Sequence, residues 1–188
     1  MNKRLGHIIS YSLPSLVLGF LLCWIGTQRH GGGREESLAE DFNRDGTPDT
    51  YFYYSNGIIA KAERDRNSDG VFDYLQWYTD GIESRFEADD NFDGVIDVRG
   101  TCQNGDVATS FADTDFNGIP DVTFAYSNGV LAAATWQPNG STNVLRLETF
   151  RHGVKAEELL DTDGNGMFDR RLLFDPFGNI LLQENVRR

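Results

Sequence analysis

Five short acidic segments recur along the chain with nearly the same arrangement of oxygen-bearing side chains. Each begins and ends with Asp, carries Asp or Asn at its third and fifth positions, and has Gly at the sixth. Such oxygen atoms, with a glycine that permits a sharp turn, are how a short loop wraps ligands around calcium. The segments are DFNRDGTPD, DRNSDGVFD, DDNFDGVID, DTDFNGIPD and DTDGNGMFD, and they start at Asp41, Asp65, Asp89, Asp113 and Asp161.

The spacing of these segments indicates a single repeat. All five start points fall on one 24-residue grid, and a fixed period of this size is typical of repeat architectures. On that grid a further loop would begin at Gln137, but residues 137–143 contain no carboxylate. The sequence therefore predicts a six-unit array with up to five calcium sites and with no metal in the fifth unit.

The distribution of charge agrees with calcium binding. The formal net charge is -12, and four basic and two acidic residues within positions 1–36 give that part +2, which leaves -14 for the remainder. Each of the five loops has three Asp at its four ligand positions, so nearly all of the acidic excess lies where cations would bind. Nucleic acid is excluded as a partner, because its binding relies on Lys and Arg that neutralise phosphates.

Hairpins are the elements that would position these loops. After each loop comes a run rich in aromatic and β-branched residues, such as Thr50 to Tyr54, which is typical of a strand. A two-residue turn such as Asn56-Gly57 follows and favours a tight hairpin, because both residues can take positive φ. A second strand, such as Ile58 to Glu63, leads into the next loop. The turn glycines keep the 24-residue spacing at Gly57, Gly81, Gly105, Gly129 and Gly153.

We therefore expect an all-β fold of tandem 24-residue β-hairpins in an antiparallel meander, with the calcium loops along one edge. About twelve strands exceed what an open twisted sheet usually holds, so an open, a coiled and a closed sheet all remain alternatives. Positions eight and fourteen of the unit are expected to share one face and to form the core, because even spacing keeps side chains on one side of a strand. Position eight is occupied by Pro48, Phe72, Ile96, Pro120, Val144 and Phe168. Position fourteen is occupied by Tyr54, Tyr78, Cys102, Tyr126, Phe150 and Phe174.

An apolar run near the N-terminus predicts a membrane segment. Ile8 to Gly26 contains no charged residue and has about the 20-residue length of a bilayer crossing. Lys3 and Arg4 precede it, which predicts a cytoplasmic start and exported, extracytoplasmic repeats. A cleaved signal peptide is the alternative and would make the repeats secreted. The predicted organisation is a signal-anchor or transmembrane helix in residues 1–28, a flexible linker in 29–40 and the repeat domain in 41–188.

The D-x-[DN]-x-[DN]-G-x-x-D pattern resembles the EF-hand-like calcium loops of thrombospondin type 3 repeats, dockerin modules and the β-propeller repeats of integrin alpha chains. The likeness covers the nine-residue loops and not the rest of each unit, and the Glu that an EF-hand needs at position twelve is missing. It implies that positions one, three, five and nine bind one ion together with the backbone carbonyl of position seven. The implied ligands are Asp41, Asn43, Asp45, Thr47 and Asp49; Asp65, Asn67, Asp69, Val71 and Asp73; Asp89, Asn91, Asp93, Val95 and Asp97; Asp113, Asp115, Asn117, Ile119 and Asp121; and Asp161, Asp163, Asn165, Met167 and Asp169.

The remaining residues favour a non-catalytic function. The three histidines, His7, His30 and His152, fit no Ser-His-Asp or Cys-His arrangement, so neither a catalytic residue nor an enzyme activity is expected. We expect a calcium-rigidified scaffold or adhesion surface that presents itself to a protein partner. The alternative is a carbohydrate- or cell-wall-binding module, in which aromatic rings offer large contact areas to glycans. Its candidate residues are Tyr51, Tyr53, Trp77 and Trp136.

Overall fold

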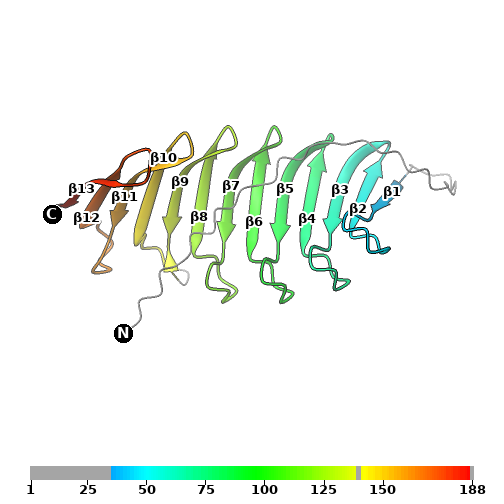
Figure 1. Cartoon of the computed structure of the whole chain (residues 1–188), viewed down its shortest axis with the longest axis horizontal. Helices are drawn as coiled ribbons and strands as arrows, with labels where there is room; N and C mark the ends of the chain where they lie inside the picture. The colour runs from blue at the N-terminus through cyan, green and yellow to red at the C-terminus, as the bar shows by residue number, and fades with distance from the viewer. Residues whose placement is uncertain (1–34, 139–140, 187–188) are drawn as a thin grey trace. The chain divides into compact units, whose positions relative to one another are not determined.

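The computed structural model describes residues 35–138 and 141–186, which lie in one compact unit, Gly32–Arg188. Within this range the chain forms thirteen β-strands in one antiparallel sheet, and strands that follow each other in sequence are neighbours throughout (Figure 1). The strands are β1 (Glu35–Glu40), β2 (Thr50–Ser55), β3 (Ile58–Arg64), β4 (Tyr74–Thr79), β5 (Ile82–Ala88), β6 (Val98–Gln103), β7 (Asp106–Ala112), β8 (Val122–Ser127), β9 (Val130–Trp136), β10 (Arg146–Arg151), β11 (Val154–Leu160), β12 (Arg170–Phe174) and β13 (Ile180–Asn185). The predicted all-β hairpin meander is confirmed.

The sheet is open in the part of the chain that the structure describes. β1 and β13 stand at its two ends, and no strand pairing joins them. Long links run along one end of the sheet and tight turns along the other (Figure 1). No helix among the described residues has the length and apolar character needed to cross a membrane, and the predicted transmembrane segment, residues 1–28, lies outside them.

One predicted boundary differs from the structure. Residues 35–40 were expected in a flexible linker, but they form β1 and pair with β2 along their whole length. In this register Leu38 lies opposite Phe52 and Ala39 lies opposite Tyr51. β1 therefore adds apolar cross-strand contacts to β2. It also satisfies the backbone groups that β2 would otherwise leave at an open edge.

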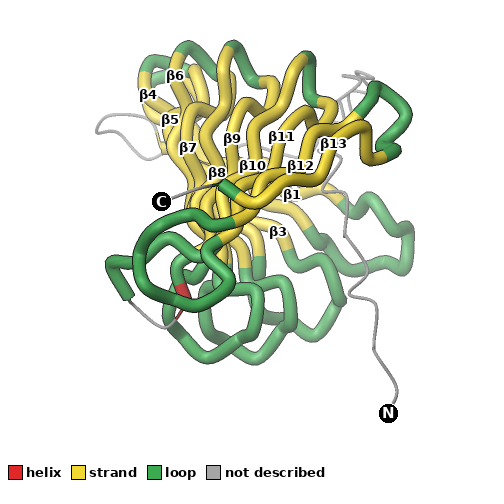
Figure 2. Tube along the Cα trace, turned by 90° about the vertical axis from the view of Figure 1, so that its left-hand side faces the viewer, coloured by secondary structure: helices red, strands yellow, loops and turns green. Residues whose placement is uncertain are grey.

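The tight turns have the conformation that the sequence predicts. Asn56 has φ 53° and Gly57 has φ 78°, as a two-residue turn with both residues at positive φ requires. Beside each of these turns the pairing slips by one residue, for example between Tyr53 and Tyr54, which leaves Ala60 as a β-bulge. A bulge increases the local twist of the sheet, and the strands fan out when the sheet is viewed along its length (Figure 2). Small side chains occupy the bulge in the first five repeats, at Ala60, Ser84, Ala108, Ala132 and Ala156, whereas Leu181 occupies it in the sixth.

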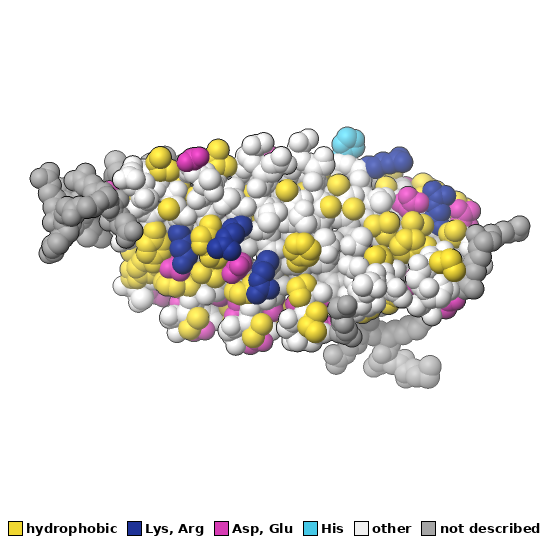
Figure 3. Space-filling view, turned by 180° about the vertical axis from the view of Figure 1, so that it is seen from behind, with side chains coloured by type: hydrophobic (Ala, Val, Ile, Leu, Met, Phe, Trp, Pro, Cys, Tyr) yellow, Lys and Arg dark blue, Asp and Glu magenta, His cyan; other side chains and the backbone are white. Residues whose placement is uncertain are grey.

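The register divides the side chains between two unlike faces. We call core face the one that carries the cross-strand rows beginning at Thr50 and Phe52, and ladder face the one that carries the rows beginning at Tyr51 and Tyr53. The ladder face shows basic, acidic and apolar side chains interleaved over the first strands (Figure 3). The buried strand residues all lie on the core face: Thr50, Ala62, Phe86, Ala88, Gly100, Ser110, Ala112, Val122, Ala134 and Glu148.

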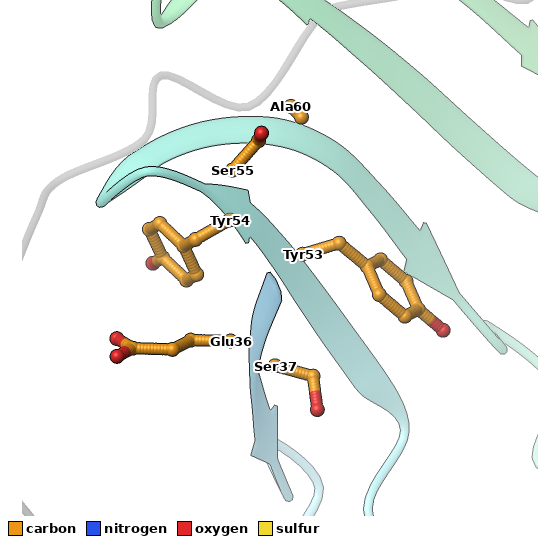
Figure 4. Close-up of a pocket in the computed structure, with 6 residues that line it drawn as sticks. All are labelled: Glu36, Ser37, Tyr53, Tyr54, Ser55 and Ala60. Atoms are coloured by element: carbon orange, nitrogen blue, oxygen red, sulfur yellow. The ribbon is translucent and has the colours of Figure 1, made fainter. Parts of the chain in front are cut away.

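Neighbouring residues of β2 illustrate this alternation. Tyr54 lies opposite Glu36 and projects to the same side, whereas Tyr53 lies opposite Ser37 and projects to the other side (Figure 4). The expected core face, made of even-numbered positions of the unit, is therefore the observed one. Its buried members stand at positions ten, twelve, twenty-two and twenty-four instead of eight and fourteen. Position eight lies before the strand, where no neighbouring strand covers it, and Pro48 and Pro120 are consequently exposed.

The core face is packed within a single layer. A large side chain lies across a small residue of the next strand: a Cβ added to Gly100 would lie 2.2 Å from Cε1 of Phe86. Phe86 also lies beside Tyr74, with ring centroids 6.2 Å apart, and Phe124 meets Trp136 edge to face. Such contacts bury apolar surface without a second sheet. They require small residues opposite the large ones, because a larger side chain would overlap the ring that packs there.

A carboxylate is half-buried at the turn end of the core face. Glu83 lies opposite Tyr78 and accepts a hydrogen bond from Nε2 of Gln76 at 3.0 Å. Burial raises the pKa of Glu83 above its usual range, because the hydrogen bond from Gln76 only partly offsets the lost hydration. Burial and the nearby Glu83 also raise the pKa of Tyr78 to about 12. Charge on Glu83 therefore disfavours the folded state.

Gly100→Ala tests the single-layer packing. We expect it to lower the free energy of unfolding by about 1–3 kcal/mol in urea denaturation, because the new methyl group overlaps the ring of Phe86. Thr101→Ala, on the exposed opposite face, is the matched control and should change stability by about 0.5 kcal/mol at most. Combining Gly100→Ala with Phe86→Leu should restore part of the stability that Gly100→Ala loses. A Gly100→Ala variant as stable as the wild type would contradict the packing described here.

Glu83→Gln tests the buried charge. A carboxyl group whose folded pKa is raised contributes stability below its unfolded pKa and loses that contribution as the pH rises through the folded pKa. Glu83→Gln should therefore be at least as stable as the wild type at pH 7. Its advantage should disappear as the pH falls towards about 4, the usual pKa of a glutamate. Thermal unfolding over this pH range measures the difference in stability. A wild type whose stability increases relative to that of the variant as the pH rises would contradict the prediction.

Candidate metal-binding loops

The five acidic segments form five links at the same end of the sheet (Figure 1). We number the loops by repeat unit: loops one, two, three and four connect β1 to β2, β3 to β4, β5 to β6 and β7 to β8, and loop six connects β11 to β12. The link between β9 and β10, which has no carboxylate, belongs to the fifth unit, and the strands on both sides of it remain paired. The strands thus keep their pairing whether or not the link between them is acidic.

The Asp at position one organises each loop around itself. In loop one, Asp41 accepts hydrogen bonds from the backbone N–H groups of Arg44 at 2.6 Å and Asp45 at 3.2 Å through Oδ1, and from Gly46 at 2.9 Å through Oδ2. The bond from the glycine N–H recurs in all five loops. It requires the left-handed backbone of the glycine, which has φ 96° at Gly46.

The Asp at position nine closes the loop from its other end. Oδ2 of Asp49 accepts hydrogen bonds from the backbone N–H groups of Phe42 at 2.9 Å and Asn43 at 3.1 Å. The backbone of Asp49 continues the ladder, with its N–H bonded to the carbonyl of Glu40. These carboxylates are well buried: Asp49, Asp73 and Asp97 are 7%, 3% and 3% exposed. Position nine therefore fastens the loop to the sheet as well as offering oxygen atoms.

Positions three and five lie on the solvent side of each loop. In loop one, Oδ1 of Asn43 accepts from the N–H of Asp45, and Nδ2 of Asn43 donates to the carboxylate of Asp45. Oδ1 of Asp45 in turn accepts from the N–H of Thr47 at 2.8 Å. These side chains are exposed, so they can turn toward a cation at little cost.

Loop six brings its carboxylates closest together. Oxygen atoms of Asp161, Asp163 and Asp169 lie within 4.8 Å of one another, and no other such group occurs among the described residues. Loop six carries its second Asp at position three, whereas in the first three loops position three is Asn and the carboxylate stands at position five. The loops thus share one fold but differ in how tightly their negative charges are grouped.

Electrostatics differ between a carboxylate of loop three and one of loop four. Burial raises the pKa of Asp97 above its usual range, and the neighbouring Asp89 and Asp93 add to the effect, although backbone N–H bonds oppose it. Burial also acts on Asp113, but the N–H groups of Gly118 and Asn117 outweigh it and lower its pKa. Position nine in loop three is therefore a carboxylate whose charge is not fully compensated, and a bound cation would stabilise it.

The aromatic residues expected to bind sugars do not form one surface. Trp77 is on the ladder face with the guanidinium of Arg85 3.7 Å from its ring centroid, whereas Trp136 is on the core face with the guanidinium of Arg146 at 4.4 Å. Tyr53 lies on the ladder face and donates a hydrogen bond to Glu63. The candidates are split between two faces, and each Trp already has a cation against its ring.

Arg66, at position two of loop two, is an interacting residue that the loop pattern does not predict. Position two varies among the loops, as Phe42, Arg66, Asp90, Thr114 and Thr162, and only the structure shows what it contacts. A comparison with protein-family models and with curated proteins found no match to this chain. The arguments below therefore rest on the loops themselves.

Asp89→Ala and Asp93→Ala separate the structural role of a carboxylate from its role as a ligand. In the presence of a chelator, Asp89→Ala should lower the free energy of unfolding by about 1–3 kcal/mol, because it removes the buried carboxylate that accepts the N–H groups of Asp93 and Gly94. Asp93→Ala, at the exposed position five, should cost clearly less. Equal losses in chemical denaturation would mean that the position-one bonds do not organise the loop.

Proposed function

We propose that this chain is a non-catalytic calcium-binding repeat protein whose ions bind along one end of the sheet and hold it rigid. The observation that carries the proposal is that five loops of one sequence pattern adopt the same hydrogen-bonded turn at the same end of the sheet. In each loop, backbone N–H groups hold the position-one carboxylate, and each carboxylate oxygen keeps lone pairs for a further partner.

The ligand chemistry favours calcium over other metals. The loops offer carboxylates, carboxamides and backbone carbonyls, and no His or Cys. Oxygen-only ligands suit hard cations, and calcium accepts more ligands in a more flexible geometry than magnesium does. The exposed side chains at positions three and five can adjust to such a shell, with water completing it.

Calcium would also relieve repulsion between loops. Adjacent loops are two strand spacings apart, roughly 10 Å, which is about one Debye length at 0.1 M salt. At this distance the three carboxylates of one loop repel those of the next. Divalent cations offset most of the charge, so a single-layer sheet with little buried apolar surface becomes stiffer and more stable.

A scaffold role for the rigid sheet follows from its two accessible faces. We propose that the chain is anchored through the apolar run at Ile8 to Gly26 and presents the repeats outside the cytoplasm to a protein partner. The glycan-binding alternative uses Trp77 and Trp136, but the cations against both rings and their placement on opposite faces favour the scaffold.

Calcium titration of the full chain in mild detergent tests the proposal. Isothermal calorimetry should count five ions, and a free calcium concentration 100-fold above the Kd should add about 2.7 kcal/mol of stability per site. The melting temperature should rise accordingly. Asp163→Asn should reduce the count to four, because it removes one of the three grouped carboxylates of loop six.

Asp80→Asn is the matched control for this titration. It removes a carboxylate from the turn between β4 and β5, where Asn56, Asn104 and Asn128 stand in other units. The count of five should survive this change. A wild-type chain that shows neither binding heat nor a shift in melting temperature between calcium and chelator would refute the proposed function.

A further inference from the structure

The guanidinium of Arg66 is held between two acidic loops. Its Nε donates to Oδ1 of Asp73, which is position nine of its own loop, and its NH1 donates to Oδ1 of Asp90 in loop three at 2.9 Å. Its NH2 donates to the backbone carbonyl of Asp89 at 2.6 Å and to that of Asp73 at 3.3 Å. One side chain thus contacts two carboxylates and two carbonyls from neighbouring repeats.

Aromatic rings hold this guanidinium in place. It lies 5.6 Å from the ring centroid of Tyr74 at the start of β4 and 5.4 Å from that of Phe92 in loop three. Burial lowers the pKa of Arg66, but the hydrogen bonds to Asp73 and Asp90 outweigh it and raise the pKa above its usual value. A planar group with several donors that is stacked and multiply bonded is well suited to bridging two carboxylates.

Position two does something different in the loops that lack an arginine. In loops four and six it is Thr114 and Thr162, whose hydroxyls donate to the position-nine carboxylates of the same loops, Asp121 and Asp169. These donors carry no charge, and the bonds stay within one loop. In loop two, by contrast, a fixed positive charge lies on a predicted calcium ligand, Asp73.

We propose that Arg66 is a built-in counter-cation that couples loops two and three and makes loop two the weakest of the five calcium sites. This inference rests on the proposed calcium function. A cation entering loop two meets a carboxylate, Asp73, that Arg66 already neutralises, and it is repelled by the guanidinium beside it. In the absence of calcium the same guanidinium holds loops two and three together, so this pair of repeats is the part of the array least dependent on metal.

Arg66→Thr tests the inference, because Thr keeps the donor that loops four and six use at this position. In a calcium titration of the full chain, the wild type should show four tighter sites and one weaker site. Arg66→Thr should tighten the weak site by about tenfold. Adding Asp69→Asn to Arg66→Thr should abolish the gain, which assigns it to loop two. Asp90→Asn, which removes the bridge to loop three but leaves the guanidinium on Asp73, should not tighten the weak site.

Arg44→Ser is the matched control for charge. It removes an arginine from loop one at a position where loop two carries Ser68, so it changes the net charge as Arg66→Thr does. In chelator, Arg66→Thr should melt about 4 °C lower than Arg44→Ser, because it alone breaks the bridge between the two loops. With saturating calcium this difference should shrink or reverse.

The outcomes separate the two proposals. Calcium binding by the wild type with an unchanged weak site in Arg66→Thr would overturn the inference about Arg66 and leave the calcium function standing. Equal melting of Arg66→Thr and Arg44→Ser in chelator would also overturn it. A chain and variants that bind no calcium at all would overturn the function itself. A tightened loop-two site together with a lower melting temperature in chelator supports the inference.

Discussion

Carboxylates that accept backbone N–H groups are the interaction on which the rest of this molecule depends. In each acidic loop, position one holds the turn from within and position nine pins the start of the turn to the next strand. These bonds involve a full negative charge, so they are stronger than bonds between neutral groups. They set the five acidic loops to the same shape, at the same end of the thirteen-stranded sheet.

The same carboxylates also bring negative charge together, and the folded chain has to compensate that charge. Each acidic loop collects at least three carboxylates at one end of a sheet that has no second layer in the described residues, and several of them are buried. The compensation is local and varied: backbone N–H groups at Asp113, threonine hydroxyls in loops four and six, and the guanidinium of Arg66 between loops two and three. A cation bound as proposed would add to this compensation where the internal donors are fewest.

Basic side chains have a second use on the faces of the sheet. Arg85 covers Trp77 and Arg146 covers Trp136, so that cations replace the apolar layer that a sandwich would supply over these rings. Around Arg146 the core face becomes ionic, with Glu148, Lys155 and Glu158 in contact. This cluster belongs to the fifth unit, where the loop has lost its carboxylates. The core face is thus held differently along the sheet, by aromatic packing in earlier units and by ion pairs in the fifth.

The sequence by itself determined the period of the repeat, the positions of loops and turns and the meander of strands, because these depend on local chemistry. An Asn-Gly pair selects its own turn, and Asp with Gly at fixed spacing selects its own loop. The face that becomes the core was also predictable from even spacing, although its most buried positions were not. Burial depends on which neighbour covers a residue, as Phe86 covers Gly100.

Only the tertiary structure decided what distant residues do to each other. It placed Leu38 against β2 and so extended the sheet into the expected linker, and it put Trp77 and Trp136 on opposite faces. It also brought Arg66 to a carboxylate 24 residues away in the next loop. Each of these arrangements involves residues from different strands or loops. It depends on register, twist and side-chain direction, which local sequence does not encode.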